Sequence, residues 1–176
     1  MRPVHLLPLA LLLAAGPAPA LELGLPLRCT PQADCWLPRY MDHDPGPGFQ
    51  DYMCGGLGTD EHSGTDFAIR DLAVMARGVP VLAAAAGSVL GTRDGMDDID
   101  VQRLGRDQIK GRECGNGVRL DHGDGWTTQY CHLRRGSVAV RTGEVVAAGQ
   151  QLGLVGMSGD ASFGWRRSTT WRLQTG

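Results

Sequence analysis

A histidine and an aspartate four residues apart form the clearest chemical pattern in the sequence. They are His62 and Asp66, separated by Ser-Gly-Thr. Imidazole and carboxylate groups are both good zinc ligands. In an extended chain the two residues would lie about 13 Å apart, whereas two ligands of one zinc ion lie within a few ångströms of each other. The pair therefore predicts a metal site if the chain bends at Ser63-Gly64; the alternative is a hydrogen-bonded pair without a metal.

A second candidate is His132, which follows the run Trp-Thr-Thr-Gln-Tyr-Cys and is expected at the end of a strand. A histidine there can transfer protons, and the alternative is a partly buried imidazole held by a hydrogen bond. His122 precedes Gly-Asp-Gly, and His43 lies between two aspartates. We interpret both of these as turn residues and not as ligands.

Short strands are the elements that must position these residues. The chain has 26 glycines and 10 prolines, which separate short runs rich in valine and leucine. This pattern is typical of an all-β domain with many turns and no long helix. Asp124-Gly125 predicts a tight hairpin, and Trp126 and Tyr130 after it are expected to pack or to line a groove. Candidate strands cover residues 65–69, 79–83, 87–91, 117–121, 126–132, 137–140 and 151–155.

Two alternative functions are excluded by single residues. Residues 138–153 have the spaced glycines and apolar positions of the hairpin sandwich in biotinyl and lipoyl carriers. They contain no lysine to carry a cofactor, so we retain the β-sandwich architecture and exclude covalent carrier function. Ser158 lies in Gly-Met-Ser-Gly-Asp. A nucleophile elbow needs glycine two places after the serine, where this chain has Asp160, which excludes that class of serine hydrolase.

The beginning of the chain predicts export. Arg2 precedes an apolar stretch over residues 6–15 and an Ala-Pro-Ala at residues 18–20, so residues 1–20 fit a signal peptide. The stretch is shorter than the about 20 apolar residues that span a bilayer, and an uncleaved membrane anchor is the alternative. We expect a periplasmic or extracellular protein without an integral membrane segment after signal removal.

Charge and cysteine content narrow the partners and the compartment. Lys and Arg number 17 and Asp and Glu number 19, a balance that excludes nucleic acid and anionic membranes as expected partners. The five cysteines can form disulfides in an exported protein. The preferred pairing joins Cys114 to Cys131 and Cys29 to Cys35. The alternative is a disulfide from Cys54 to Cys29 or Cys35, and the sequence leaves the connectivity open.

One acidic segment invites comparison with a calcium site. It covers residues 93–112 and contains four aspartates, namely Asp94, Asp97, Asp98 and Asp100. The segment lacks the glycine at the sixth position and the glutamate at the twelfth position of an EF-hand loop. We therefore expect a solvated loop here.

Three phrases in order resemble the lysostaphin or LytM-type zinc metallopeptidases of bacterial cell walls. They are HxGTDF from His62, YxHL from Tyr130 and GxxGxSG from Gly153, and the resemblance extends over residues 54–163. It implies an antiparallel sheet with a groove across it, of the duplicated hybrid motif type. It also implies that His62 and Asp66 bind zinc, that His132 is catalytic, and that water activated by zinc cleaves peptides of peptidoglycan.

The chain departs from this family after Phe163. The family closes with His-x-His, which supplies one catalytic histidine and the third zinc ligand, but no histidine follows His132 here. Two ligands should hold zinc weakly or not at all. We predict a lead-in over residues 21–53, the peptidase-like domain over 54–163 and an atypical tail over 164–176.

Two hypotheses account for the departure. The first is that the reading frame is shifted or truncated near Phe163, so that the chain is an inactive or shortened peptidase. The second is a non-catalytic relative that binds peptidoglycan or regulates another wall enzyme. The sequence does not indicate which cross-link is recognised or what the oligomeric state is.

Overall fold

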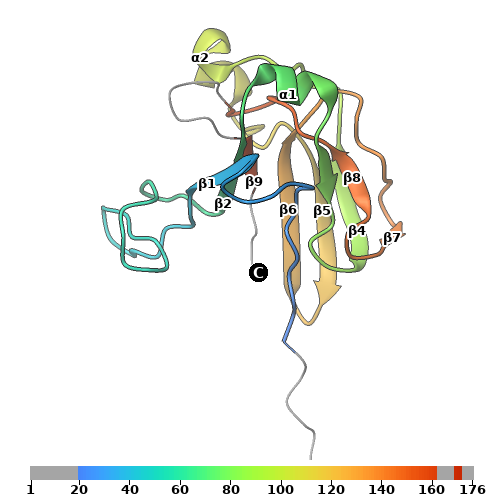
Figure 1. The fold of residues 1–176 in the computed structure, drawn as a ribbon, viewed down its shortest axis with the longest axis horizontal. Helices are drawn as coiled ribbons and strands as arrows, with labels where there is room; N and C mark the ends of the chain where they lie inside the picture. The colour runs from blue at the N-terminus through green and yellow to red at the C-terminus, as the bar shows by residue number, and fades with distance from the viewer. Residues whose placement is uncertain (1–19, 162–168, 172–176) are drawn as a thin grey trace, which may run out of the picture.

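The computed structural model describes residues 20–161 and, as backbone only, the strand at 169–171 (Figure 1). The described part contains three antiparallel sheets and a few short helices, which confirms the all-β class. The elements are β1 Cys35–Arg39, β2 Thr65–Ile69, α1 Leu72–Arg77, β3 Pro80–Leu82, β4 Gly87–Arg93, α2 Val101–Leu104, the 3-10 helix η1 Arg106–Ile109, β5 Asn116–Gly123, β6 Trp126–Leu133, β7 Val145–Val146, β8 Gln151–Leu154 and β9 Thr169–Trp171.

The largest sheet has the order β6-β5-β4-β7 and contains the predicted hairpin. Asp124 and Gly125, between β5 and β6, have φ angles of 50° and 81°, as a tight turn of this kind requires. Side chains of β5 alternate, since Val118 and Leu120 are buried and Arg119 between them is exposed. Burial of each aliphatic side chain of this size stabilises the fold by about 1.5–3 kcal/mol, so the sheet is a firm base for the loops at its ends.

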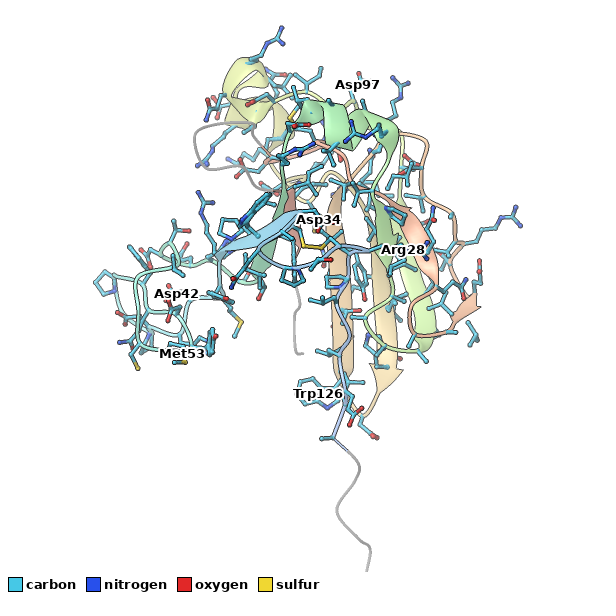
Figure 2. The ribbon with its side chains drawn as sticks, viewed as in Figure 1. Arg28, Asp34, Asp42, Met53, Asp97 and Trp126 are labelled. Carbon is cyan, nitrogen blue, oxygen red and sulfur yellow. A yellow bond between two sulfur atoms is a disulfide. The ribbon has the colours of Figure 1, made fainter. Side chains whose placement is uncertain are left out.

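A smaller sheet, of order β1-β2-β9, carries Asp66. Arg39 of β1 is paired with Asp66, and an irregularity in the register separates this pair from the pair Trp36 and Ala68. In the described part β1 is an edge strand, where Pro38 needs no hydrogen-bond donor. The third sheet pairs β3 with β8. Residues between β1 and β2 form a loop that projects away from the sheets, and Asp42 and Met53 lie in it (Figures 1 and 2).

Several elements differ from the sequence prediction. Residues 137–140 form no strand, although Ala139 donates to the carbonyl of Leu152 at 2.9 Å. The strands β1, β7 and β9 were not predicted because they are short and lack regular alternation. Helix α1 was not predicted either. The side chain of Asp71 caps its first turn by accepting from the Val74 amide at 2.7 Å.

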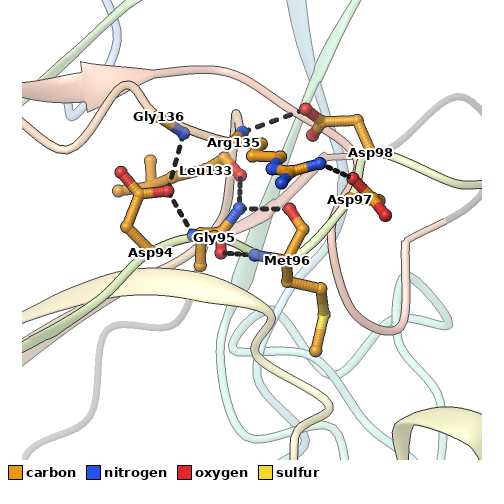
Figure 3. Close-up of polar contacts among 9 residues, drawn as sticks. Asp94, Gly95, Met96, Asp97, Asp98, Leu133, Arg135 and Gly136 are labelled. Atoms are coloured by element: carbon orange, nitrogen blue, oxygen red, sulfur yellow. Dashed lines mark hydrogen bonds and ion pairs between the residues drawn. The ribbon is translucent and has the colours of Figure 1, made fainter.

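The aspartate-rich segment, residues 93–112, is only in part the solvated loop that the sequence predicted, since residues 94–100 are loop with Asp94 and Asp97 exposed. It contains α2 and η1, and its carboxylates hold a neighbouring loop through backbone amides (Figure 3). Asp94 accepts from the amide of Gly136 at 2.7 Å, and Asp98 accepts from the amides of Arg135 at 3.0 Å and Met157 at 2.6 Å. These bonds tie the segment to the chain on both sides of β8.

The two preferred cysteine pairs are confirmed. Disulfides join Cys29 to Cys35 and Cys114 to Cys131, and Cys54 is a free exposed thiol. Within residues 20–161 and 169–171, no helix has the length and apolar character needed to cross a membrane. The predicted signal peptide, apart from Ala20, lies outside the described residues, as does the predicted tail apart from the backbone of β9.

Candidate functional site

The structure brings the predicted zinc ligands together. Nε2 of His62 lies 3.0 Å from Oδ1 of Asp66. The bend that this requires lies just before β2, where Glu61 has a positive φ of 61° and the amide of His62 donates to the carbonyl of Thr59 at 3.0 Å. Gly64, also before β2, is buried. The chain therefore turns between residues 59 and 64 and then enters the strand that holds Asp66.

Three atoms of this pair are buried without a hydrogen-bond partner among the described residues. They are Nε2 of His62 and both carboxylate oxygens of Asp66, whose side chains are 10% and 0% exposed. An unsatisfied buried polar atom costs about 1–3 kcal/mol, so such a cluster needs an explanation. Ligand atoms around one tetrahedral zinc ion lie about 3–3.5 Å apart, a range that includes this pair. The donor set and its spacing fit a shared cation.

A basic residue faces the other side of the carboxylate. Nη1 of Arg39 lies 3.7 Å from Oδ2 of Asp66, and the two residues are partners in the ladder between β1 and β2. The guanidinium balances part of the buried negative charge and leaves Oδ1 beside His62. Arg39 was not among the predicted site residues, because β1 has no clear strand pattern and its pairing with β2 spans a long loop.

His132 lies in a distorted part of β6. The ladder between β5 and β6 is irregular between Asn116 and Val118, where β6 has one extra residue. His132 itself has a positive φ of 59°, which is unusual for a residue with a side chain. Opposite it, Gly117 is required, because a Cβ there would lie 2.5 Å from the carbonyl oxygen of Tyr130. The bulge turns the histidine away from the regular alternation of the strand.

Hydrogen bonds hold the buried His132 ring in one orientation. The side chain is buried, its backbone amide donates to the carbonyl of Cys114 at 2.7 Å, and Nδ1 lies 2.6 Å from the carbonyl oxygen of Ser158. A carbonyl can only accept, so Nδ1 carries the proton in the neutral ring and Nε2 is the basic nitrogen.

His62 and His132 line one cleft of about 310 Å³. An adjoining cleft of about 470 Å³ is lined by His62 and by the loop over residues 41–47. The two clefts meet at Asp60, Glu61 and His62, which line both. The other residues lining the smaller cleft are Arg39, Thr59, Asp60, Glu61, Arg106, Glu113, Cys114, Cys131 and Asp160.

His132 does not join the pair as a third ligand. In the part of the chain that the structure describes, one group of three ligand-type residues lies within 4.8 Å, and it consists of Cys29, Asp34 and Cys35. Its two cysteines form a disulfide and are not thiolate ligands. His62 and Asp66 are therefore a pair of ligand-type side chains, and His132 lines the same cleft as His62.

The strand β9 lies where a further ligand would be expected. It pairs with β2 on the side away from β1, and its backbone also runs close to β6. The residue paired with Asp66 in this ladder is Thr170, and no histidine follows His132 in the sequence. The strand next to the carboxylate thus supplies no imidazole.

The two other histidines that the structure describes, His43 and His122, are placed elsewhere. Nδ1 of His122 lies 2.7 Å from the carbonyl oxygen of Ala86 and its Nε2 lies 2.8 Å from the hydroxyl of Thr128, at the end of the hairpin. His43 lies in the projecting loop, where its amide donates to the carbonyl of Gln50. Neither histidine lines the cleft that His62 and His132 share.

The two aromatic residues that were expected to pack or to line a groove, Tyr130 and Trp126, lie in different parts of the structure. Tyr130 is in the core, and its hydroxyl accepts from the amide of Ala84 at 2.7 Å. Burial raises the pKa of Tyr130 above its ordinary value. Trp126 is 42% exposed at the start of β6, at the far end of the hairpin (Figure 2). Tyr130 is therefore a packing residue.

Comparisons with solved structures find similar chains in bacteria. This chain is 25% identical to a putative peptidase M23 from Pseudomonas aeruginosa, with a TM-score of 0.42 over 86% of this chain and 48% of that one. It is 23% identical to a zinc-containing peptidase from Vibrio cholerae, with a TM-score of 0.41 over 70% and 32%. It is 22% identical to a variant of the catalytic domain of the prophage-encoded M23 protein EnpA from Enterococcus faecalis, with a TM-score of 0.47 over 78% and 88%.

The chain thus spans about half of the Pseudomonas protein and about a third of the Vibrio protein. A comparison with curated proteins gives no match. The model of peptidase family M23 matches residues 60–170, which include His62, Asp66 and His132. Because this match extends over more than half of the sequence, the chain belongs to peptidase family M23.

Proposed function

We propose that this chain is a zinc-dependent metalloendopeptidase-type domain that acts on peptide cross-links of peptidoglycan outside the cytoplasm. The observation that carries the proposal is the pair of His62 and Asp66. Nε2 of His62 and both carboxylate oxygens of Asp66 are buried and make no hydrogen bond among the described residues, and His62 lines the cleft that His132 also lines. Membership of peptidase family M23 supports peptide hydrolysis. Two disulfides support an oxidising compartment.

His62 and Asp66 would hold the zinc ion. Nε2 of the histidine and Oδ1 of the aspartate supply the donors, and Arg39 beside Oδ2 keeps the carboxylate oriented. Bound zinc supplies Lewis-acid chemistry, by polarising the scissile carbonyl and acidifying a water molecule.

His132 is the proposed proton-transfer residue. With its Nδ1 proton donated to the carbonyl of Ser158, its Nε2 accepts a proton from the attacking water. The same nitrogen then returns the proton to the departing amine. Because the ring is buried and held before any substrate arrives, little reorganisation is needed.

A non-catalytic, peptidoglycan-binding or regulatory role is the second candidate. It is favoured by Thr170 at the position paired with Asp66 and by the lack of a histidine after His132. Catalytic zinc sites usually have three protein ligands, so a two-donor site should bind zinc weakly. In this alternative the cleft binds wall peptides without cleaving them.

One set of measurements separates the two candidates. Zinc affinity is measured by competition with a chromophoric chelator, and cleavage is measured as new amino groups released from purified peptidoglycan. An enzyme should bind zinc and release amino groups, and His62→Ala should abolish both, while the control His122→Gln should change neither. Sedimentation with peptidoglycan, without zinc binding or cleavage, would favour the binding role. Absence of all three activities would reject both.

A further inference from the structure

Ser158 contacts the proposed proton-transfer residue through its backbone. Its carbonyl oxygen lies 2.6 Å from Nδ1 of His132, and both residues are buried. The sequence phrase GxxGxSG, in which Ser158 is the serine, has no role in the zinc pair. This contact gives the phrase a place in the site.

The hydroxyl of Ser158 fixes the position of that carbonyl. It donates to the carbonyl of Leu133 at 2.8 Å and accepts from the amide of Asn116 at 2.9 Å. Leu133 directly follows His132 at the end of β6, and Asn116 begins β5. The side chain therefore connects the turn at residues 156–159 to both strands of the hairpin, next to the histidine.

The turn has no room to move towards β5. Gly115 has a positive φ of 65°, and a Cβ on it would lie 2.4 Å from the carbonyl carbon of Ser158. A Cβ on Gly159 would lie 2.2 Å from the carbonyl oxygen of Glu113. The backbone of residues 158 and 159 thus lies directly against residues 113–115, and the hydroxyl of Ser158 holds it there as well.

We propose that Ser158 is a positioning residue that fixes His132 in the tautomer with its proton on Nδ1. Its carbonyl accepts that proton, and its buried hydroxyl keeps the carbonyl in place. A neutral imidazole has one N–H group, so donation from Nδ1 to a carbonyl leaves Nε2 as the basic nitrogen. The catalytic meaning of this arrangement rests on the proposed function, whereas the arrangement itself does not require zinc.

The test is nitrogen-15 NMR of the full chain labelled at histidine, in metal-free buffer. We expect His132 to populate the Nδ1–H tautomer, with slow exchange of the Nδ1 proton. Ser158→Ala should lower the ratio of Nδ1–H to Nε2–H tautomer by about five- to tenfold, the equivalent of one ordinary hydrogen bond, and speed proton exchange. Thr128→Ala is the matched control. It also removes a buried hydroxyl from this region, one bonded to Tyr130 and His122, and should leave His132 unchanged.

Three results would overturn the proposal. They are an Nε2–H tautomer in the wild type, an unchanged His132 in folded Ser158→Ala, and an equal change in Thr128→Ala. If Ser158→Ala does not fold, the tautomer of the wild type tests the role of the carbonyl. The role of the hydroxyl is then tested with Ser158→Cys, which keeps a weaker donor and should give an intermediate ratio of Nδ1–H to Nε2–H tautomer. The NMR measurement is made without metal. A finding that the chain does not bind zinc would therefore contradict the proposed function, but it would not affect the result for Ser158 and His132.

Discussion

The two halves of the candidate site are built differently. On one side, His132 is held through its amide by Cys114 and through its ring by Ser158. On the other side, the facing atoms of His62 and Asp66 are buried but have no hydrogen-bond partner among the described residues. The difference is that hydrogen bonds already hold the first half, whereas the second half has buried donor atoms that the proposed cation would bind. Changes to zinc or its ligands should therefore affect the second half alone.

The largest expected effect comes from removing a proposed zinc donor. His62→Ala or Asp66→Ala should weaken zinc binding by more than about 100-fold, because loss of indirect partners alone already costs about 10- to 100-fold. Chelator competition measures the change. His132→Ala should bind zinc nearly as well as the wild type, since His132 does not form a group of three ligand atoms within 4.8 Å with His62 and Asp66 in the described chain. A comparable loss of affinity in His132→Ala would remove the distinction between the halves.

The next largest effect concerns the disulfide beside His132. Replacing Cys114 and Cys131 by alanine should lower the free energy of unfolding by about 3 kcal/mol, given their sequence separation of 17. Replacing Cys29 and Cys35, with a separation of 6, should have a smaller effect of about 2 kcal/mol. Urea unfolding measures both. Replacing Cys114 and Cys131 should also change the NMR resonances of His132, and replacing Cys29 and Cys35 should not. The reverse result would contradict the assignment of Cys114 to the His132 half of the site.

A smaller effect of opposite sign is expected for Asp66→Asn in metal-free protein. The amide can donate to Nε2 of His62 while its oxygen faces Arg39, so buried atoms that make no hydrogen bond among the described residues gain one. We expect the free energy of unfolding to rise by about 1 kcal/mol while zinc binding is lost. Thermal unfolding in chelator, with and without added zinc, measures both changes. A less stable metal-free variant would show that the pair is not held in an unsatisfied state.

The smallest effect is a pH dependence of the projecting loop. Amide donors from Asp44 and Gln50, and also from Glu61, lower the pKa of Asp42 below its ordinary value. A lowered pKa in the folded state contributes stability above the unfolded pKa of about 3.8, and this stability is lost as the pH falls through the folded value. Loop protection, measured by hydrogen exchange, should fall only below about pH 4. Asp42→Asn should remove that dependence; an unchanged acid profile would exclude Asp42 as its source.

The sequence predicted the parts of the fold that depend on local patterns. Asp124-Gly125 encodes a hairpin because it supplies the positive φ angles, and the alternation around Leu120 encodes a half-buried strand. Strand β1 could not be predicted from local patterns, because it contains Pro38 and is stabilised by pairing with a strand far along the chain. The region at 137–140 has strand-like residues, yet these residues do not join a neighbouring strand in a regular ladder.

The candidate site divides in the same way. His62 and Asp66 could be found from their types and spacing, and their predicted approach needs only the local bend before β2. Residue type and spacing could not have identified Arg39 or the carbonyl of Ser158. The first depends on the register of β1, and the second is a backbone atom that no pattern of side chains reveals.

A zinc titration followed by nitrogen-15 NMR of the histidine rings tests the difference between the halves most directly. We predict that zinc changes the Nε2 resonance of His62 and leaves His132 with its proton on Nδ1. If zinc leaves His62 unchanged, or acts on His132 instead, the assignment of the cation to the His62 and Asp66 pair is wrong.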